Sequence, residues 1–165
     1  MKIIMFLLFL ALAIQIPHSV NAQSQNYSQT EFTVSGSLLF EYGYTSGGYG
    51  GNIKFLLPRR SNSNYITIAA NYDRLKVSGF KNYYYNLITA TAGYRKMVSN
   101  FYIEPQLGLG YFLSEDAALT FGPEFGLHKN NLTFSFNYRA AVMGFFLSDL
   151  IHIFSLKAGL RLSKK

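Results

Sequence analysis

The sequence predicts an all-β fold: an eight-stranded antiparallel up-and-down transmembrane β-barrel, preceded by a cleaved signal peptide. Three observations support this prediction. The chain begins with an apolar leader, and eight segments after it alternate apolar and polar residues with a period of two. The polar positions of these segments carry only about one charge per segment, which is too few for a surface in water. We therefore expect the apolar faces to contact lipid.

The leader, residues 1–22, has the features of a secretory signal peptide. Residues 3–14 form an almost unbroken apolar run, and small residues at Val20 and Ala22 precede a cleavage point before Gln23. The alternative is a single membrane anchor, but the run is shorter than the roughly 20 residues that a spanning helix needs. The sequence thus predicts a signal peptide at 1–22 and one barrel domain at 23–165.

Composition excludes several other classes of protein. The chain has no cysteine, which argues against a lipoprotein and against a small exported domain held by disulfides. Removal of Lys2 with the leader lowers the formal charge from +7 to +6. The basic residues are spread along the chain without a clustered stripe, so we expect no nucleic-acid partner. A basic exported protein could instead meet the phosphates of an anionic membrane surface.

The eight segments share one pattern, which is clearest between Leu132 and Val142. There, even positions are apolar and odd positions are polar before Ala141. This alternation is expected for a strand with one apolar face and one polar face. Several segments have the roughly 10 residues that a tilted strand needs to cross a bilayer. The segments are 32–42, 52–57, 66–73, 87–95, 102–111, 119–128, 132–142 and 154–162.

The connections between segments alternate between tight turns at one end of the barrel and outward-facing connections at the other. Asn130-Asn131 is expected to form a two-residue hairpin turn, because asparagine tolerates a positive φ, and the connection at Ser99-Asn100 is nearly as short. An even number of strands leaves both termini at the end where these turns lie, which we assign to the periplasm. The remaining connections, which would face outward, are 43–50, 74–82, 114–116 and 144–149. Proline has no backbone N–H to donate a hydrogen bond within a sheet. Pro105 and Pro123 are therefore expected to mark paired β-bulges.

The polar faces predict a charge network inside the barrel. A soluble barrel such as a lipocalin would place its apolar residues inside and its charges outside. We expect salt bridges that fill the narrow lumen, with Arg95 facing Glu104 and Arg139 near Glu124. A proton or ion pathway is the alternative. The predicted network consists of Glu41, Lys54, Asp73, Arg95, Glu104, Glu124, Arg139, Lys157 and Arg161.

Three stretches carry a family resemblance: Tyr102–Tyr111, Gly122–Leu127 and Leu156–Leu162. With the leader, they resemble the small porin-like outer-membrane β-barrel domain family of Gram-negative bacteria, as in the OmpX and OmpA transmembrane domains. The resemblance implies a location in the cell outer membrane. It implies two partners, lipopolysaccharide-containing outer-membrane lipid and the barrel assembly machinery. Members of the family usually end on an aromatic residue, whereas here Leu162 holds that position before Ser163-Lys164-Lys165.

The predicted function is non-enzymatic: a structural or envelope-interaction role for a monomeric barrel without metal or cofactor. One alternative is an enzyme that modifies lipid A, which would need a serine and a histidine within hydrogen-bond reach. His128 faces a periplasmic hairpin, and Ser155 points to the opposite face from His152. The other alternative is a narrow channel for small or apolar solutes.

One outward connection carries three cations, Arg74, Lys76 and Lys81. Guanidinium and ammonium groups bind phosphate, so these residues are candidates for contact with lipid A phosphates. The alternative is a solvated loop without a ligand. The sequence leaves both interpretations open.

Overall fold

The computed structural model describes residues 28–41, 44–59, 64–76, 84–113, 117–143 and 149–163. These residues form eight strands and no helix, as predicted. Each strand spans 12 to 15 residues, enough for a tilted strand to cross a bilayer. The strands are β1 (Gln29–Glu41), β2 (Tyr44–Pro58), β3 (Tyr65–Lys76), β4 (Tyr84–Val98), β5 (Phe101–Phe112), β6 (Ala117–Lys129), β7 (Leu132–Met143) and β8 (Asp149–Ser163).

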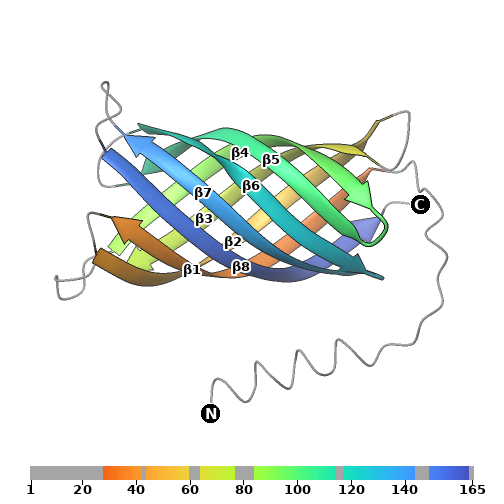
Figure 1. Ribbon diagram of the computed structural model, residues 1–165, viewed down its shortest axis with the longest axis horizontal. Coiled ribbons are helices and arrows are strands. Elements are labelled where there is room, and N and C mark those ends of the chain that lie inside the picture. Colours follow the sequence, from red (N-terminus) through yellow and green to blue (C-terminus); the bar gives the residue numbers. More distant parts are fainter. Residues whose placement is uncertain are drawn as a thin grey trace, which may run out of the picture.

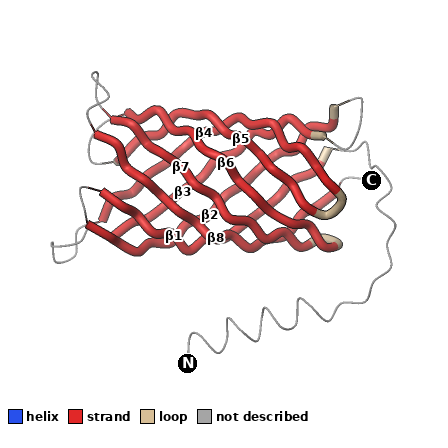
Figure 2. Tube along the Cα trace, in the orientation of Figure 1, coloured by secondary structure: helices blue, strands red, loops and turns tan. Residues whose placement is uncertain are grey.

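The strands close into an up-and-down barrel (Figure 1). Each strand pairs antiparallel with the next, and β8 pairs with β1. The strands run at a tilt around the barrel, and β1 begins at the same end at which β8 finishes. The two hairpin turns 99–100 and 130–131 lie at this end, drawn on the right in Figure 2. We call it the turn end, and the other end of the barrel the opposite end. Within the described ranges, no helix is long and apolar enough to cross a membrane.

Side chains alternate between the interior and the outer surface, as predicted. In β3, Ile66 and Ile68 are exposed on the outer surface while Thr67 and Asp73 are buried inside. All eight strands expose large apolar side chains on the outer surface, and the most exposed of these among the described residues is Val34, at 70 %. A closed sheet has no free edge, so each strand's backbone pairs on both sides. Along most of the barrel, apolar side chains lie outside and charged side chains lie inside.

Both predicted hairpin turns are present. Asn130 has a φ of 56° and Ser99 a φ of 58°, the left-handed conformation that two-residue turns of this kind require. Lys129 pairs with Leu132 across the first turn, and the β4–β5 ladder likewise closes directly around residues 99–100. These turns fix the register of two ladders, and the register decides which side chains face each other inside the barrel.

The glycine-rich stretch after β1 is a strand and not the predicted connection. β2 begins at Tyr44, and Gly48 and Gly50 pair with both β1 and β3. A Cβ atom at Gly48 would lie 2.4 Å from the backbone oxygen of Arg74, and one at Gly50 2.3 Å from that of Tyr72. Glycine therefore permits a close approach of β2 to β3 here, and ladders on both sides outweigh its low strand propensity.

The expected bulges at Pro105 and Pro123 are wrong. The two prolines face each other directly in the β5–β6 ladder. The β4–β5 ladder omits two pairs, at Pro105 and Glu104, and the β6–β7 ladder omits two, at Gly122 and Pro123, but the register is the same on both sides of each gap. Each proline thus interrupts the ladder on the side where its missing N–H would have donated, without inserting a residue.

Other strands also extend beyond the predicted segments. β3 continues to Lys76, so Arg74 and Lys76 belong to a strand and not to an outward connection. β8 begins at Asp149, five residues before the predicted segment. Lys81 and the predicted signal peptide at 1–22 lie outside the described residues.

Candidate functional site

A network of ion pairs occupies the barrel interior toward the turn end. Glu104 and Glu124 face each other directly across the β5–β6 ladder, an arrangement in which two carboxylates would repel. Lys54 lies between them, with its Nζ atom 2.9 Å from Oε1 of each carboxylate. All three side chains are 1 % exposed. One lysine on β2 therefore bridges two acidic residues on β5 and β6.

Arg95 and Lys157 complete this network. Arg95 Nη1 lies 2.9 Å from Oε2 of Glu31, and Arg95 Nε donates to Glu104. Lys157 Nζ lies 2.8 Å from Oε2 of Glu124. The three cations and three carboxylates are formally neutral together, which offsets much of the cost of burying them. We call these six residues the charge network: Glu31, Lys54, Arg95, Glu104, Glu124 and Lys157.

Neutral side chains complete the hydrogen bonding of the network. Tyr102 donates its hydroxyl to Glu124 Oε1 at 2.7 Å, and Thr67 donates to Glu104 Oε1 at 2.9 Å. The Arg95 guanidinium lies 3.8 Å from the centre of the Tyr102 ring. Buried charges are tolerated when their remaining hydrogen-bonding capacity is satisfied in this way. The six charges come from β1, β2, β4, β5, β6 and β8, so the network links six strands across the interior.

A second ion pair lies nearer the opposite end of the barrel. Arg139 Nη2 donates to Asp73 Oδ2, and Arg139 Nη1 donates to Thr89 Oγ1 at 2.8 Å. Ser37 and Ser155 are joined by a hydrogen bond of 2.9 Å on the same level. Arg139 therefore pairs with Asp73 on β3, across the lumen, and the expected pairing with Glu124 is wrong.

The interior at the opposite end is apolar. Leu75, Leu87, Ala141, Ile151 and Ile153 are completely buried there. These residues hold inward positions at the ends of β3 and β7 and at the starts of β4 and β8. They form one cluster with three more side chains, and we call the eight residues the apolar cluster: Leu39, Leu75, Leu87, Phe112, Ala118, Ala141, Ile151 and Ile153.

The structure brings together most residues of the predicted charge set. Seven form ion pairs inside the barrel: Lys54, Asp73, Arg95, Glu104, Glu124, Arg139 and Lys157. The facing of Arg95 and Glu104 is as predicted from the 99–100 turn. Arg161 lies at the turn end and donates from Nη2 to the backbone oxygen of Asn130 at 3.3 Å. Glu41 is the last residue of β1, and its side chain lies outside the described residues.

The predicted phosphate-binding residues occupy the end of β3. The Arg74 guanidinium lies 4.4 Å from the centre of the Tyr84 ring, and Lys76 is exposed. Both side chains thus lie near the rim of the barrel at the opposite end, on the outer face of β3.

Sequence reasoning missed Glu31 and the apolar cluster. Glu31 lies one residue before the first predicted segment, yet it has the same inward parity as Thr33 and Ser37. The signal for the cluster was also present: apolar residues occupy both faces at Leu38-Leu39 and Leu87-Ile88. Two adjacent apolar residues at a strand end indicate that the interior itself becomes apolar there.

The two histidines of the barrel lie on opposite sides of its wall. His128 is inside, 2.9 Å from Arg95 Nη1 through Nε2 and 2.8 Å from Thr133 Oγ1 through Nδ1. His152 is on the outer side, where Nδ1 lies 2.8 Å from the Tyr138 hydroxyl. Ser155 is buried inside, so it cannot act with His152. Across the described strands and turns, no group of three or more histidine, cysteine or acidic side chains could hold a metal ion.

Comparison with known proteins identifies the fold. No family model and no curated protein matches the chain. Among solved structures, Neisserial surface protein A is similar with a TM-score of 0.59 and 14 % identity, over 88 % of this chain and all of that one. Ail, the attachment invasion locus protein of Yersinia pestis, solved with the heparin analogue sucrose octasulfate, is similar with a TM-score of 0.53 and 16 % identity, over 82 % of this chain and 97 % of that one.

A designed transmembrane β-barrel also matches, with a TM-score of 0.53 and 10 % identity, over 80 % of this chain and 95 % of that one. The design and the natural proteins share the same closed sheet despite low identity. The Neisserial and Yersinia proteins are small eight-stranded outer-membrane β-barrels. This protein therefore has the fold of the small eight-stranded outer-membrane β-barrels.

Proposed function

We propose that this protein is an integral β-barrel of the bacterial outer membrane, with a structural or envelope-interaction role and a lumen filled by side chains. The observation that carries the proposal is the apolar outer surface of a closed barrel. Soluble monomers rarely expose a continuous apolar surface of more than a few hundred Å². Here every strand exposes at least one large apolar side chain, for example Val34, Phe55, Ile68, Ile88, Leu109, Phe121, Phe136 and Leu156.

Fractionation of cells that express the full chain tests the location. We expect the protein in the outer-membrane fraction, and we expect its electrophoretic mobility to change when the sample is boiled, because a folded barrel resists unfolding by detergent. Recovery in the soluble periplasmic fraction, with one mobility before and after boiling, would contradict the proposal.

A substitution on the outer surface separates a membrane barrel from a soluble one. Leu107 lies midway along β5 and is 58 % exposed. In lipid, Leu107→Arg should lower the free energy of unfolding by about 2–4 kcal/mol, the cost of a cation near the middle of a bilayer. The matched control is Leu113→Arg, at a side chain of similar exposure just beyond β5, where the cost should be about 0–1 kcal/mol. Equal, small effects would indicate an outer surface in water.

The filled lumen is supported by the two kinds of interior packing. An eight-stranded barrel is just wide enough for side chains to fill, and both the charge network and the apolar cluster consist of buried residues. Planar-bilayer recording of purified protein should therefore show no steady conductance. A steady current would favour a narrow channel.

A non-enzymatic role is supported by the positions of Ser155 and His152 on opposite sides of the wall. We expect the acylation pattern of lipid A to be the same in cells with and without the gene. A pattern that changes with the gene, and that requires His152 or His128, would favour a lipid A modifying enzyme.

The rim at the opposite end supports contact with anionic lipid. Arg74 and Lys76 lie at the end of β3 that, with the termini in the periplasm, faces the outer leaflet. Phosphate groups of lipopolysaccharide could bind there, and Ail provides a precedent for an anionic ligand on a barrel of this fold. Replacement of both cations by glutamine should weaken retention of lipopolysaccharide on purified protein. Unchanged retention would indicate a solvated rim.

A further inference from the structure

The net charge of the barrel is divided unevenly between its two ends. Inside, four carboxylates and four cations cancel in the charge network and in the pair of Arg139 with Asp73. The formal charge of +6 carried by residues 23–165 therefore belongs to the strand ends and their connections. We propose that the turn end carries this charge and binds the anionic headgroups of phospholipids in the adjacent leaflet. The inference rests on the proposed location in a membrane.

The opposite end is close to electrical balance, because it combines four acidic residues with three cations. They stand at the end of β1, in the last three residues of β3, at the start of β8, or in the sequence between two strands that join there. These residues are Glu41, Arg74, Lys76, Lys81, Glu115, Asp116 and Asp149. The opposite end therefore adds little to the net charge of the chain.

In the part of the chain that the structure describes, the turn end carries cations but no exposed carboxylate. The three connections that turn back at this end contain no aspartate or glutamate. The described acidic side chains nearest to it, Glu31 and Glu104, are 1 % exposed and bonded to Arg95. Each even-numbered strand, in contrast, has a cation within two residues of its end: Arg59 after β2, Lys96 on β4, Lys129 on β6 and Arg161 on β8. The excess positive charge therefore lies at the turn end.

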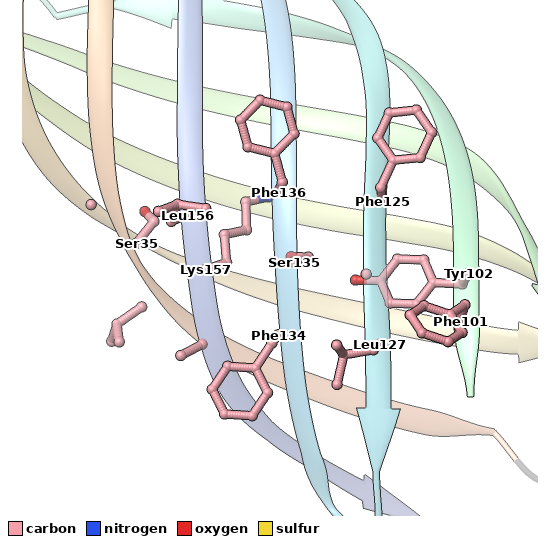
Figure 3. A pocket seen from close by; sticks show the side chains of 14 residues that line it. Ser35, Phe101, Tyr102, Phe125, Leu127, Phe134, Ser135, Phe136, Leu156 and Lys157 are labelled. Atoms are coloured by element: carbon pink, nitrogen blue, oxygen red, sulfur yellow. The ribbon is translucent and has the colours of Figure 1, made fainter. Parts of the chain in front are cut away.

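Two of these cations stand where the apolar outer surface ends. Lys96 is exposed and faces Ile103 across the β4–β5 ladder. Two residues nearer the turn, Phe101 pairs with Leu127 of β6 (Figure 3), and Lys129 is the next outward residue of β6 after Leu127. A cation at the edge of a lipid-facing surface rests its alkyl part on apolar neighbours and places its charge at the level of the headgroups. Lipid phosphate is the anion found at that level, so charge complementarity selects an anionic headgroup.

The arrangement of the cations favours lipid over a soluble acidic partner. They belong to alternate strands, which lie about 10 Å apart, so they surround the barrel instead of forming one compact site. Lys96 has outward parity, away from the mouth of the barrel where a soluble polymer or protein would dock. At the mouth, Arg161 has inward parity and donates to the backbone oxygen of Asn130, so it adds charge to the rim without contact on the outer wall. Headgroups that surround the barrel match this ring of charge.

Quenching of tryptophan fluorescence by brominated lipid tests the inference at each end separately, because the chain has no tryptophan. A single tryptophan is introduced by Phe101→Trp at the turn end or by Tyr111→Trp at the opposite end, both exposed positions of β5. The proteins are folded in mixed liposomes in which either phosphatidylglycerol or phosphatidylcholine has brominated acyl chains. The ratio of quenching gives the relative affinity of the two lipids beside that tryptophan. We expect a roughly tenfold preference for phosphatidylglycerol beside position 101, equivalent to about 1.4 kcal/mol, and similar quenching by both lipids beside position 111.

Lys96→Gln in the Phe101→Trp protein removes one charge from this rim. It should lower the preference for phosphatidylglycerol roughly fivefold, as expected for one cation near an anionic surface. The matched control is Lys96→Arg, which keeps the charge and should keep the preference. A rise in ionic strength should lower the preference as well, since the contact is electrostatic.

The outcomes separate the headgroup site from the membrane barrel itself. Each protein is first tested for the mobility change on boiling, and a parent chain without this change contradicts the proposed barrel. In barrels that show the change, equal quenching by both lipids beside position 101, or a preference that survives both Lys96→Gln and high salt, would overturn the headgroup site. Binding to isolated peptidoglycan that Lys96→Gln abolishes, without a lipid preference, would assign the cations to an acidic polymer instead.

Discussion

The interior of the barrel is filled in two ways. Toward the turn end, Lys54, Arg95 and Glu124 belong to a network whose charges cancel within one connected set of ion pairs. At the opposite end, Leu87 and Phe112 belong to a cluster that contains no polar group. Ion pairs depend on exact partners, whereas apolar packing depends on volume. The two regions should therefore respond differently to the loss of one side chain.

The largest effect is expected for Lys54→Met. The substitution keeps most of the side chain's length and removes its charge, which leaves Glu104 and Glu124 facing each other without the cation that separates them. We expect the free energy of unfolding to fall by about 4 kcal/mol, as for other broken buried pairs. Urea titration in detergent, followed by the mobility of the folded band, measures this loss. Lys76→Met, at an exposed position of β3, is the control and should stay within about 0.5 kcal/mol.

Leu87→Ala tests the apolar cluster. Leu87 is completely buried, so its truncation leaves a cavity and should cost about 3 kcal/mol. The control is Leu113→Ala, because Leu113 is 54 % exposed. The same urea titration measures both variants. A loss below about 1 kcal/mol for Leu87→Ala would indicate that the cluster can collapse around the missing side chain.

A double-mutant cycle on Asp73 and Arg139 separates the value of an ion pair from the cost of breaking it. Arg139→Met leaves a buried carboxylate and Asp73→Leu leaves a buried guanidinium, so each should destabilise the barrel. The double substitution restores neutrality, and we expect a coupling energy of about 2 kcal/mol between the two sites. Additive effects would show that the two side chains do not stabilise each other.

The smallest effect is expected for Gly126→Ala. An added Cβ would lie 2.4 Å from the Tyr102 ring, and the hydroxyl of that ring donates to Glu124. Displacement of the ring should cost about 1–2 kcal/mol through overpacking. Gly47→Ala adds the same methyl group in open space and should leave the unfolding midpoint unchanged. Equal midpoints for both variants would show that Tyr102 can move without cost.

The comparison also shows what could be predicted from sequence. The period of two and the short turns are local properties of the sequence. They predict the number of strands, the closure of the barrel, which residues point inward and the Arg95–Glu104 pair. The pairing of Arg139 with Asp73 joins β7 to β3 across the lumen. Such a partner depends on the diameter of the closed barrel and cannot be read from neighbouring strands.

Two other differences have similar physical causes. The stretch from Gly47 to Gly51 has a low strand propensity, but pairing on both sides holds it in β2. Ile151 and Ile153 fall on the inward face, where the alternation alone predicts polar residues. At this level the interior becomes apolar, so a rule of polar residues inside holds only for part of the length of the barrel.

Spin labelling along β7 tests the central claim most directly, namely that the outer surface contacts lipid and the interior is filled. The chain has no cysteine, so single cysteines can be introduced at Phe134, Ser135, Phe136 and Asn137 and labelled in liposomes. Labels at 134 and 136 should collide with oxygen, which dissolves in lipid, and labels at 135 and 137 with neither oxygen nor a water-soluble nickel complex. Collisions of the nickel complex with labels at 134 and 136 would contradict the account, because the outer surface would then face water.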